Sequence, residues 1–200
     1  SGGTLWLGAI YFSFQIYCDF SGYSDIAIGI SKLFGFELMS NFNFPYFSRN
    51  IGEFWRRWHI SLSTWFRDYL YIPLGGSKEG KWKSIRNIFI IFLVSGFWHG
   101  SNWTFIFWGL FHSILFLPSF IFRTNRKYTT SIIGENKLLP TLKEFIQVGT
   151  TFLLVTIGWV FFRSETIGDS FGYLSNMMTY DLSFQKGKGL ILVMLILFFD

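Results

Sequence analysis

The sequence predicts an all-α membrane protein, and its composition, its apolar runs and its small residues each support that class. Half of the 200 residues are hydrophobic, only 14% are charged, and the mean hydropathy is +0.37. A soluble domain carries about 25% charged residues, so this depletion is typical of chains that lie in a bilayer. The 27 Phe and 9 Trp residues suit lipid-facing surfaces and interfacial aromatic belts. We therefore predict a polytopic bundle of transmembrane helices, with residues 1–200 forming one membrane-embedded unit.

The charge and cysteine content narrow the classes of partner. A net charge of +5 would also suit nucleic-acid binding. However, the basic residues lie in loops beside apolar runs, where cytoplasmic membrane flanks explain them without nucleic acid. The single Cys18 excludes an intrachain disulfide and a cysteine-based zinc site. Three well-separated histidines make a weak pattern of metal ligands, so we expect no bound metal.

The first membrane segment is expected within residues 1–40. An apolar run over residues 5–17 ends at Cys18 and Asp19, and a stretch rich in Gly and Ser follows it. Small residues at this density let membrane helices approach closely. Asp19 and Asp25 are six positions apart, so they point to different faces of one helix. Each is either an interfacial or pore-facing carboxylate or a catalytic one, and we assign Asp25 to the substrate path.

Residues 53–72 predict an amphipathic helix in the membrane interface. Phe54, Trp58 and Tyr69 belong to a set of apolar residues that recurs at three- and four-residue steps, as on one face of a helix. A second face carries polar residues at the same steps, namely Arg56, His59, Ser63 and Arg67. A basic helix with several tryptophans normally lies in the interface.

The stretch GFWHGSNW, residues 96–103, places His99 in the middle of a long apolar region. An ionisable side chain at membrane depth is costly unless it faces protein or a water-filled cavity, so His99 marks a functional site. The small polar residues after it break the apolar run, which is tolerated only beside protein or a cavity. Imidazole suits general-base catalysis because its unperturbed pKa of about 6.5 lies near the operating pH.

Two loops with an excess of basic residues, 48–86 and 123–144, are both expected on the cytoplasmic side. The region between them must then enter and return on the same side. Residues 87–98 are fewer than the roughly 20 that a spanning helix needs. We therefore predict a re-entrant or short helix that turns near His99, which forms a hairpin over residues 87–122.

The C-terminal part of the sequence predicts one complete transmembrane helix over residues 145–162. A nearly charge-balanced loop over residues 163–188 is expected on the outer side, and residues 189–200 begin another helix. The final apolar run is too short to cross a bilayer. We therefore expect this sequence to be an internal or C-terminal fragment of a longer protein, and its fold to be partial.

The remaining histidines and motifs are less informative. His112 lies inside an apolar run, where we expect a core histidine that is hydrogen-bonded to a neighbouring helix. His59 lies among arginines whose charge favours its neutral form, and the pattern leaves its role open. The sequence contains neither the GxxxxGK[ST] loop that cradles phosphates nor the HExxH zinc motif.

Two stretches carry a family resemblance: residues 17–76, from YCDFSGY to IPLGG, and residues 95–112, SGFWHGSNWTFIFWGLFH. Together they resemble the membrane-bound O-acyltransferase family, most closely its bacterial alginate O-acetyltransferase branch. The resemblance covers residues 8–113, and the remainder matches in hydropathy alone. The sequence departs from the family chiefly by lacking its N-terminal spans, so the resemblance implies a partial fold. It implies a histidine in a membrane-buried tunnel. By its WHG context the family's near-invariant histidine falls on His99, and a second conserved polar position falls on His59 within WRRWH.

The resemblance implies an enzyme that moves an acetyl group from a cytoplasmic thioester donor to a hydroxyl acceptor, for O-acetylation of an exported polysaccharide such as alginate. His99 would act as the general base and His59 would assist it. Acetyl-CoA would be a co-substrate, and no cofactor would be bound. A further set would bind substrate or line the tunnel, namely Arg56, Trp58, Ser63, Trp98, Asn102 and Asp25.

The resemblance also implies a place in the cell. The protein would be a multi-pass protein of the bacterial cytoplasmic membrane, in contact with lipid. Its partners would be a separate extracytoplasmic acetyltransferase and the polysaccharide export machinery.

Two alternatives remain open. The same fold would also serve D-alanyl transfer to teichoic acid, although the sequence IPLGG and the WRRWH form favour the polysaccharide branch. A transporter or channel would use the buried His and Asp side chains as a polar path instead.

Overall fold

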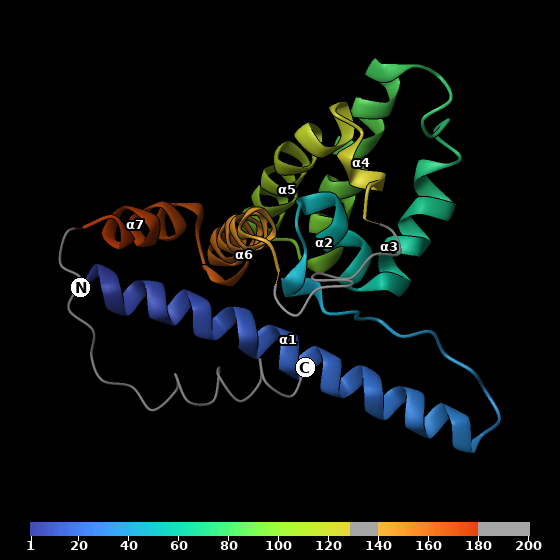
Figure 1. Cartoon of the computed structure of the whole chain (residues 1–200), viewed down its shortest axis with the longest axis horizontal. Coiled ribbons are helices and arrows are strands. Elements are labelled where there is room, and N and C mark those ends of the chain that lie inside the picture. The colour runs from blue at the N-terminus through green and yellow to red at the C-terminus, as the bar shows by residue number, and fades with distance from the viewer. Residues whose placement is uncertain (129–139, 180–200) are drawn as a thin grey trace.

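A computed structural model describes residues 1–128 and 140–179 of the chain, and every regular element in these two ranges is helical (Figure 1). The longer helices are α1 (Gly2–Leu33), α4 (Lys81–His99), α5 (Trp103–Ile121), α6 (Leu142–Arg163) and α7 (Ile167–Met177). Shorter elements are η1 (Pro45–Phe47), α2 (Ile51–Arg57), α3 (Ile60–Phe66), the π-helical turn η2 (Arg67–Tyr71) and η3 (Thr124–Arg126). The predicted all-α class is confirmed.

Helix α1 is one continuous helix of 32 residues that runs on through Cys18 and Asp19, where the apolar run of the sequence ends. No proline interrupts the Gly- and Ser-rich half. The hydroxyl of Ser31 donates to the carbonyl of Ile28 within the helix, which satisfies it locally. The helix ends where Gly35 adopts a φ of +81°, a left-handed conformation that glycine accepts without a steric penalty. The N-terminal part of α1 packs against α6 and α7 (Figure 1).

The predicted single helix over residues 53–72 is also wrong, because the chain breaks at Trp58 and His59. Trp58 is extended, with φ −105° and ψ 127°. His59 is left-handed, with φ 44° and ψ 58°, and α3 begins at the next residue. The aromatic residues before and after the break differ in exposure: Phe54 on α2 is buried, whereas Tyr69 on η2 is 69% exposed. The stretch therefore has no single apolar face.

Helices α4 and α5 form an antiparallel hairpin that turns just after His99, as predicted (Figure 1). The predicted half-length segment is wrong, because α4 begins at Lys81 and has 19 residues. At 1.5 Å per residue it is about 28 Å long, close to the hydrocarbon thickness of a bilayer. The two backbones lie close together at Gly96 and Gly109, where a Cβ atom would lie 2.3 and 2.2 Å from a carbonyl oxygen of the other helix.

Helices α5 and α6 are both long and apolar enough to span a membrane. Helix α6 contains the predicted span over residues 145–162. The predicted loop over residues 163–188 is wrong in part, because α7 lies within it. Thr166 starts α7 by accepting a hydrogen bond from the backbone N–H of Asp169, a local capping pattern that hydropathy does not reveal. The helix predicted from residue 189 lies outside the described residues.

The core lies between α1, α2, α5 and α6 and is mainly aromatic. Tyr46, Phe54, Trp58, Trp108 and Trp159 are all buried in it. One ion-pair cluster lies beside this core: the carboxylate of Glu53 is fully buried and accepts hydrogen bonds from the side chains of Arg49 and Arg57. Rigid packing here fixes the end of α2, and hence the break that carries His59.

Candidate active site

His59 is positioned by its unusual backbone and by one asparagine. The Asn41 side-chain oxygen accepts hydrogen bonds from the backbone N–H and the hydroxyl of Ser61, at 3.2 and 2.6 Å. The Asn41 amide group donates to the hydroxyl of Ser24 on α1 at 3.2 Å. Ser61 in turn lies 3.5 Å from the Nδ1 atom of His59. Asn41 therefore ties the start of α3 to α1, and it sets the place of the imidazole.

Aromatic rings surround the His59 imidazole. The ring of Phe20 meets it edge-on at 4.6 Å between centroids, and the ring of Trp98 lies at 6.2 Å. Burial lowers the pKa of His59 to about 4, and the nearby His99 contributes to this shift. The neutral form is therefore favoured as we expected. Its cause is burial, and the neighbouring arginines that we had expected to act are not among the causes.

His99 is the last residue of α4, and packing fixes its orientation. Its ring lies edge-on to three aromatic rings, with centroid distances of 5.0 Å to Trp98, 5.1 Å to Phe162 and 5.3 Å to Trp108. Trp108 comes from α5 and Phe162 from α6, so three helices hold one imidazole.

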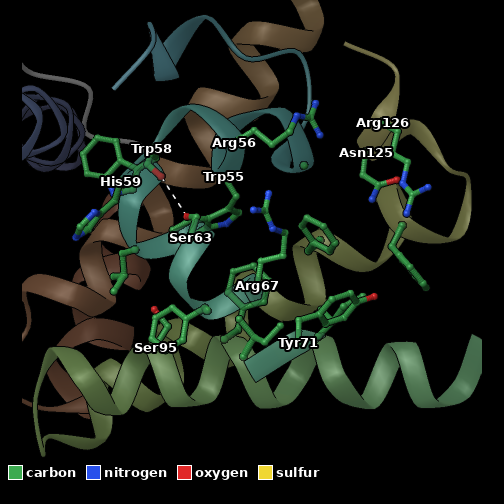
Figure 2. A pocket seen from close by; sticks show the side chains of 18 of the residues that line it. Trp55, Arg56, Trp58, His59, Ser63, Arg67, Tyr71, Ser95, Asn125 and Arg126 are labelled. Atoms are coloured by element: carbon green, nitrogen blue, oxygen red, sulfur yellow. Dashed lines mark hydrogen bonds between the residues drawn. The ribbon is translucent and has the colours of Figure 1, made fainter. Parts of the chain in front are cut away.

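Two cavities meet at the histidine pair. The first, of about 340 Å³, runs between α3, α4 and α5 (Figure 2). The second, of about 670 Å³, lies between α1 and the aromatic residues of α5 and α6. Trp58, His59 and His99 line both cavities. The two histidines therefore stand where a molecule from either cavity can reach them.

The structure brings most, though not all, of the predicted site residues together. Arg56 and Ser63 line the first cavity, and Trp98 lines the second. Because the chain breaks between them, Arg56 and Ser63 lie on two different helices, α2 and α3, and both line the first cavity. Their roles as substrate-binding residues remain predictions.

Asp25 and Asn102 lie apart from this group, because they line neither cavity. Asp25 lies exposed on the C-terminal half of α1. Asn102 begins α5, where its side chain accepts a hydrogen bond from the N–H of Thr104 and donates to the carbonyl of Glu165 at 2.7 Å. Asn102 is thus the N-terminal cap of α5.

Several lining residues were not predicted. The second cavity contains two polar side chains of α1, Gln15 and Asp19, one helical turn apart. The sequence drew attention to Asp19 but did not assign it to the site, and no sequence pattern pointed to Gln15. No sequence pattern pointed to Phe162 either, because aromatic residues are so common in this chain that a single one does not stand out.

His112 is a core histidine, as predicted, but without the predicted hydrogen bond. It is fully buried on α5, and among the described residues neither ring nitrogen has a hydrogen-bond partner. Its ring contacts Trp55 and Trp108, and its Nε2 atom would lie 2.6 Å from a Cβ atom at Gly158. It lines neither cavity.

Other chemistries find less support in this arrangement. Within residues 1–128 and 140–179, no three His, Cys, Asp or Glu side chains lie together as metal ligands.

Residues 168–172, GDSFG, match the GxSxG spacing of a serine hydrolase. That motif requires a strand-to-helix turn with an exposed hydroxyl. Here it lies inside α7, and the hydroxyl of Ser170 is buried and donates to the carbonyl of Thr166.

The fold and the site define a helical protein with at least two helices fit to span a membrane and a histidine pair between two cavities. Residues 3–134 match the family model described as MBOAT, membrane-bound O-acyltransferase family. The chain belongs to the membrane-bound O-acyltransferase family. The resemblance seen in the sequence is confirmed, and the chain is that of a membrane protein.

Curated relatives refine this placement. The chain is 46% identical over 184 residues to "Probable alginate O-acetylase AlgI" of Pseudomonas syringae pv. tomato, which covers 90% of the chain and 33% of that protein. It is 41% identical to "Peptidoglycan O-acetyltransferase" of Helicobacter pylori, over 86% of the chain and 31% of that protein. It is 35% identical to "Teichoic acid D-alanyltransferase" of Bacillus subtilis, over 77% and 40%. The chain thus spans about a third of the length of the first of these relatives.

Proposed function

We propose that the intact protein moves an acetyl group from a cytoplasmic thioester donor to a hydroxyl acceptor, for O-acetylation of an exported polysaccharide such as alginate. The observation that carries this proposal is the placement of His59 and His99 where two cavities meet. Holding a donor and an acceptor within reach of one catalytic group turns their bimolecular reaction into an effectively unimolecular one. Relatives named as O-acetylating enzymes, at 41 and 46% identity, support the reaction class.

The chemistry would use the imidazole of His99 as a general base. It accepts the proton of the acceptor hydroxyl while that oxygen forms a bond to the thioester carbonyl carbon. The C–S bond then breaks, and the proton passes to the sulfur, which leaves an ester and a free thiol. A positioned base of this kind contributes about 10²–10⁴-fold to the rate. His59 would orient the acceptor or stabilise the negative charge that develops on the carbonyl oxygen.

The two cavities would divide the substrates between them. The first cavity is lined by Arg56, Arg67 and Arg126, which come from the basic segments that we predict to be cytoplasmic. We assign the thioester donor to this cavity. The second cavity is lined by aromatic side chains with Gln15 and Asp19, and we assign the hydroxyl acceptor to it.

The basic loops also support a proposal for where the protein lies in the cell. We propose a multi-pass location in the bacterial cytoplasmic membrane, with the basic loops inside. A separate extracytoplasmic acetyltransferase and the polysaccharide export machinery would then take the acetyl group onward. D-alanyl transfer is a second candidate, because a relative named for that activity shares 35% of its residues over 77% of the chain.

The test is His99→Ala in the intact protein, expressed in a polymer-secreting strain that lacks the native gene. We expect unacetylated polymer at unchanged yield. Asp25→Asn is the matched control, since Asp25 lies outside both cavities, and it should leave the acetyl content normal. Normal acetylation with His99→Ala would contradict the proposal, and lost export with intact acetylation would indicate a transporter. Isotope-labelled acetyl and D-alanyl donors offered to membranes separate the two transfer reactions.

A further inference from the structure

A third cavity lies beside α1, α6 and α7, and the proposed chemistry does not use it. Its volume is about 480 Å³. The three helices contact one another near the N-terminus of the chain (Figure 1). Neither His59 nor His99 lines this cavity, although Phe12 and Trp159 line both it and the second one. The third cavity is therefore a neighbour of the site and has its own set of side chains.

The walls of the third cavity are fixed by bonds between α1 and α7. The hydroxyl of Tyr173 donates to the carbonyl of Leu5 at 2.7 Å, and the indole N–H of Trp6 donates to the carbonyl of Met177 at 3.1 Å. A Cβ atom at Gly8 would lie 3.1 Å from the Tyr173 hydroxyl, so the glycine lets the ring come close to α1. The cavity is thus a built feature of the fold.

Arg163 is the one charged residue among those described that line this cavity. It is the last residue of α6, a helix fit to span a membrane, and it is exposed. Its guanidinium carbon lies 5.0 Å from the centroid of the Phe12 ring, which turns the side chain towards α1. Within the described part of the chain Arg163 forms no ion pair with a carboxylate. An arginine remains protonated in proteins, so this charge is suited to an anion.

The hydroxyl groups of the lining are already engaged. Tyr173 and Ser164 each donate their proton to a backbone carbonyl, at 2.7 Å in both cases. The hydroxyl of Thr4 lies 3.0 Å from that of Ser1. Arg163 is therefore the main source of free hydrogen-bond donors in this lining. Such a lining suits a ligand with one anionic group better than a sugar, whose many hydroxyl groups would lose their water without gaining partners.

The rest of the lining is largely apolar, with Leu5, Ala9, Phe12 and Val160 among its residues. A long basic side chain at the end of a spanning helix reaches the level of the lipid headgroups. There its planar set of donors can bind a phosphate with two hydrogen bonds at once. A ligand that carries a phosphate at this level and an apolar chain below it matches both parts of the cavity.

We propose that the third cavity binds one anionic phospholipid, with its phosphate on Arg163 and the start of one acyl chain along the apolar wall. Basic pockets between transmembrane helices are suited to such headgroups. The bound lipid would contact α1, α6 and α7 together and would stabilise their packing, because a ligand that binds only the folded protein raises its stability. This inference does not depend on acyl transfer.

A free phosphate and a soluble headgroup share the anionic chemistry, and the test separates them from the lipid. The intact protein in detergent is titrated with phosphatidylglycerol, phosphatidylcholine, glycerophosphoglycerol and inorganic phosphate. An apparent Kd is taken from the rise in unfolding temperature, relative to the same protein without additive. We expect phosphatidylglycerol to bind at least about tenfold more tightly than phosphatidylcholine, and the two soluble anions to cause no rise.

The variants are Arg163→Gln and Arg163→Lys. Arg123→Gln is the matched control, because Arg123 also follows a spanning helix and is exposed, but it lines none of the three cavities. Loss of the charge-assisted hydrogen bonds in Arg163→Gln should weaken phosphatidylglycerol binding about ten- to a hundredfold and remove the preference over phosphatidylcholine. Arg163→Lys keeps the charge and should keep that preference. Arg123→Gln should bind like the wild type.

Three outcomes overturn the proposal. Unchanged phosphatidylglycerol binding in Arg163→Gln would place the lipid elsewhere, and equal weakening by Arg123→Gln would indicate attraction to basic charge in general. Binding of glycerophosphoglycerol or phosphate as tightly as the lipid would indicate a site for a soluble anion. Acetyl transfer is measured on the same preparations, so loss of the lipid site and failure of the proposed function are seen separately.

Discussion

His59 and His99 line the same two cavities, and each imidazole has the indole of Trp98 as a neighbour, with centroid distances of 6.2 and 5.0 Å. One histidine lies in a break between two short helices, and the other ends a long one. The pair therefore depends on two local features, the left-handed residue at 59 and the turn after 99. A change in either feature should separate the histidines without removing them.

Asn41 is expected to act as a positioning residue for His59. Asn41→Ala removes the acceptor of two Ser61 hydrogen bonds and the link to Ser24. We expect kcat for acyl transfer to fall about tenfold or more, because a small misplacement of a catalytic group is costly, while the donor KM changes little. Asn41→Asp retains an acceptor for Ser61 and should restore most of the rate.

The control for this experiment is Asn43→Ala, because Asn43 is exposed and holds Arg57 through backbone atoms. Its kcat should equal that of the wild type. If Asn41→Ala and Asn43→Ala lower kcat equally, or if Asn41→Ala lowers only the unfolding temperature, Asn41 does not position His59.

The sequence predicted those features of the fold that are set by local signals. The turn after His99 was predictable because Gly100 and Asn102 end one apolar run and begin another. The span over residues 145–162 was predictable from its length and hydropathy. The break at His59 was not, because apolar residues keep a helical spacing through it. That break is imposed by the packing of Trp58 into the tertiary core.

The chemistry of the candidate site was predictable from the sequence, but only some of its residues were. His99 stood out because an ionisable residue in an apolar run requires a reason. The cavities form only when α1, α4, α5 and α6 come together, so Gln15 and Phe162 gave no signal in advance. Asn102 shows the opposite difficulty, since in a sequence a polar residue that follows a histidine in an apolar run looks the same whether it binds substrate or caps a helix, and the structure shows the cap.

The contact between α4 and α5 predicts a steep cost for any side chain at Gly109. A Cβ atom there would lie 2.2 Å from the carbonyl oxygen of Phe92. We expect Gly109→Ala to destabilise the intact protein by about 1–3 kcal/mol, because the helices must move apart. The measurement is thermal unfolding in detergent.

Gly149→Ala on α6 is the matched control, since among the described residues no atom beyond its chain neighbours and its own helix backbone lies within 4 Å of its Cβ position. It should be neutral, or stabilising by up to about 1 kcal/mol, because alanine favours a helix over glycine. Equal unfolding temperatures for the two variants would show that the hairpin does not depend on close approach at Gly109.

The buried carboxylate of Glu53 predicts a large loss of stability when its charge is removed. Glu53→Gln leaves the side chains of Arg49 and Arg57 without the anion that they bind at 3.0 and 2.8 Å. Breaking a buried ion pair by removing one partner costs about 3–5 kcal/mol. Glu79→Gln removes the partner of Lys83 in an exposed pair and should leave the unfolding temperature unchanged. A similar, small effect of both substitutions would contradict the structural role of Glu53.

The burial of His59 predicts a specific dependence of stability on pH. Its pKa is about 4 in the folded protein, below the value of about 6.5 that is expected in the unfolded chain. As the pH falls below about 6.5, the unfolded chain takes up a proton that the folded protein does not, so stability decreases, and the effect levels off below about pH 4. His59→Gln removes the contribution of His59 to this pH dependence of stability. We therefore expect a smaller drop in unfolding temperature between pH 7.5 and 5 in the variant than in the wild type. Each protein is compared with itself at two pH values, so the loss of ring packing against Phe20 cancels. Equal drops in the two proteins would show that His59 takes up its proton without unfolding.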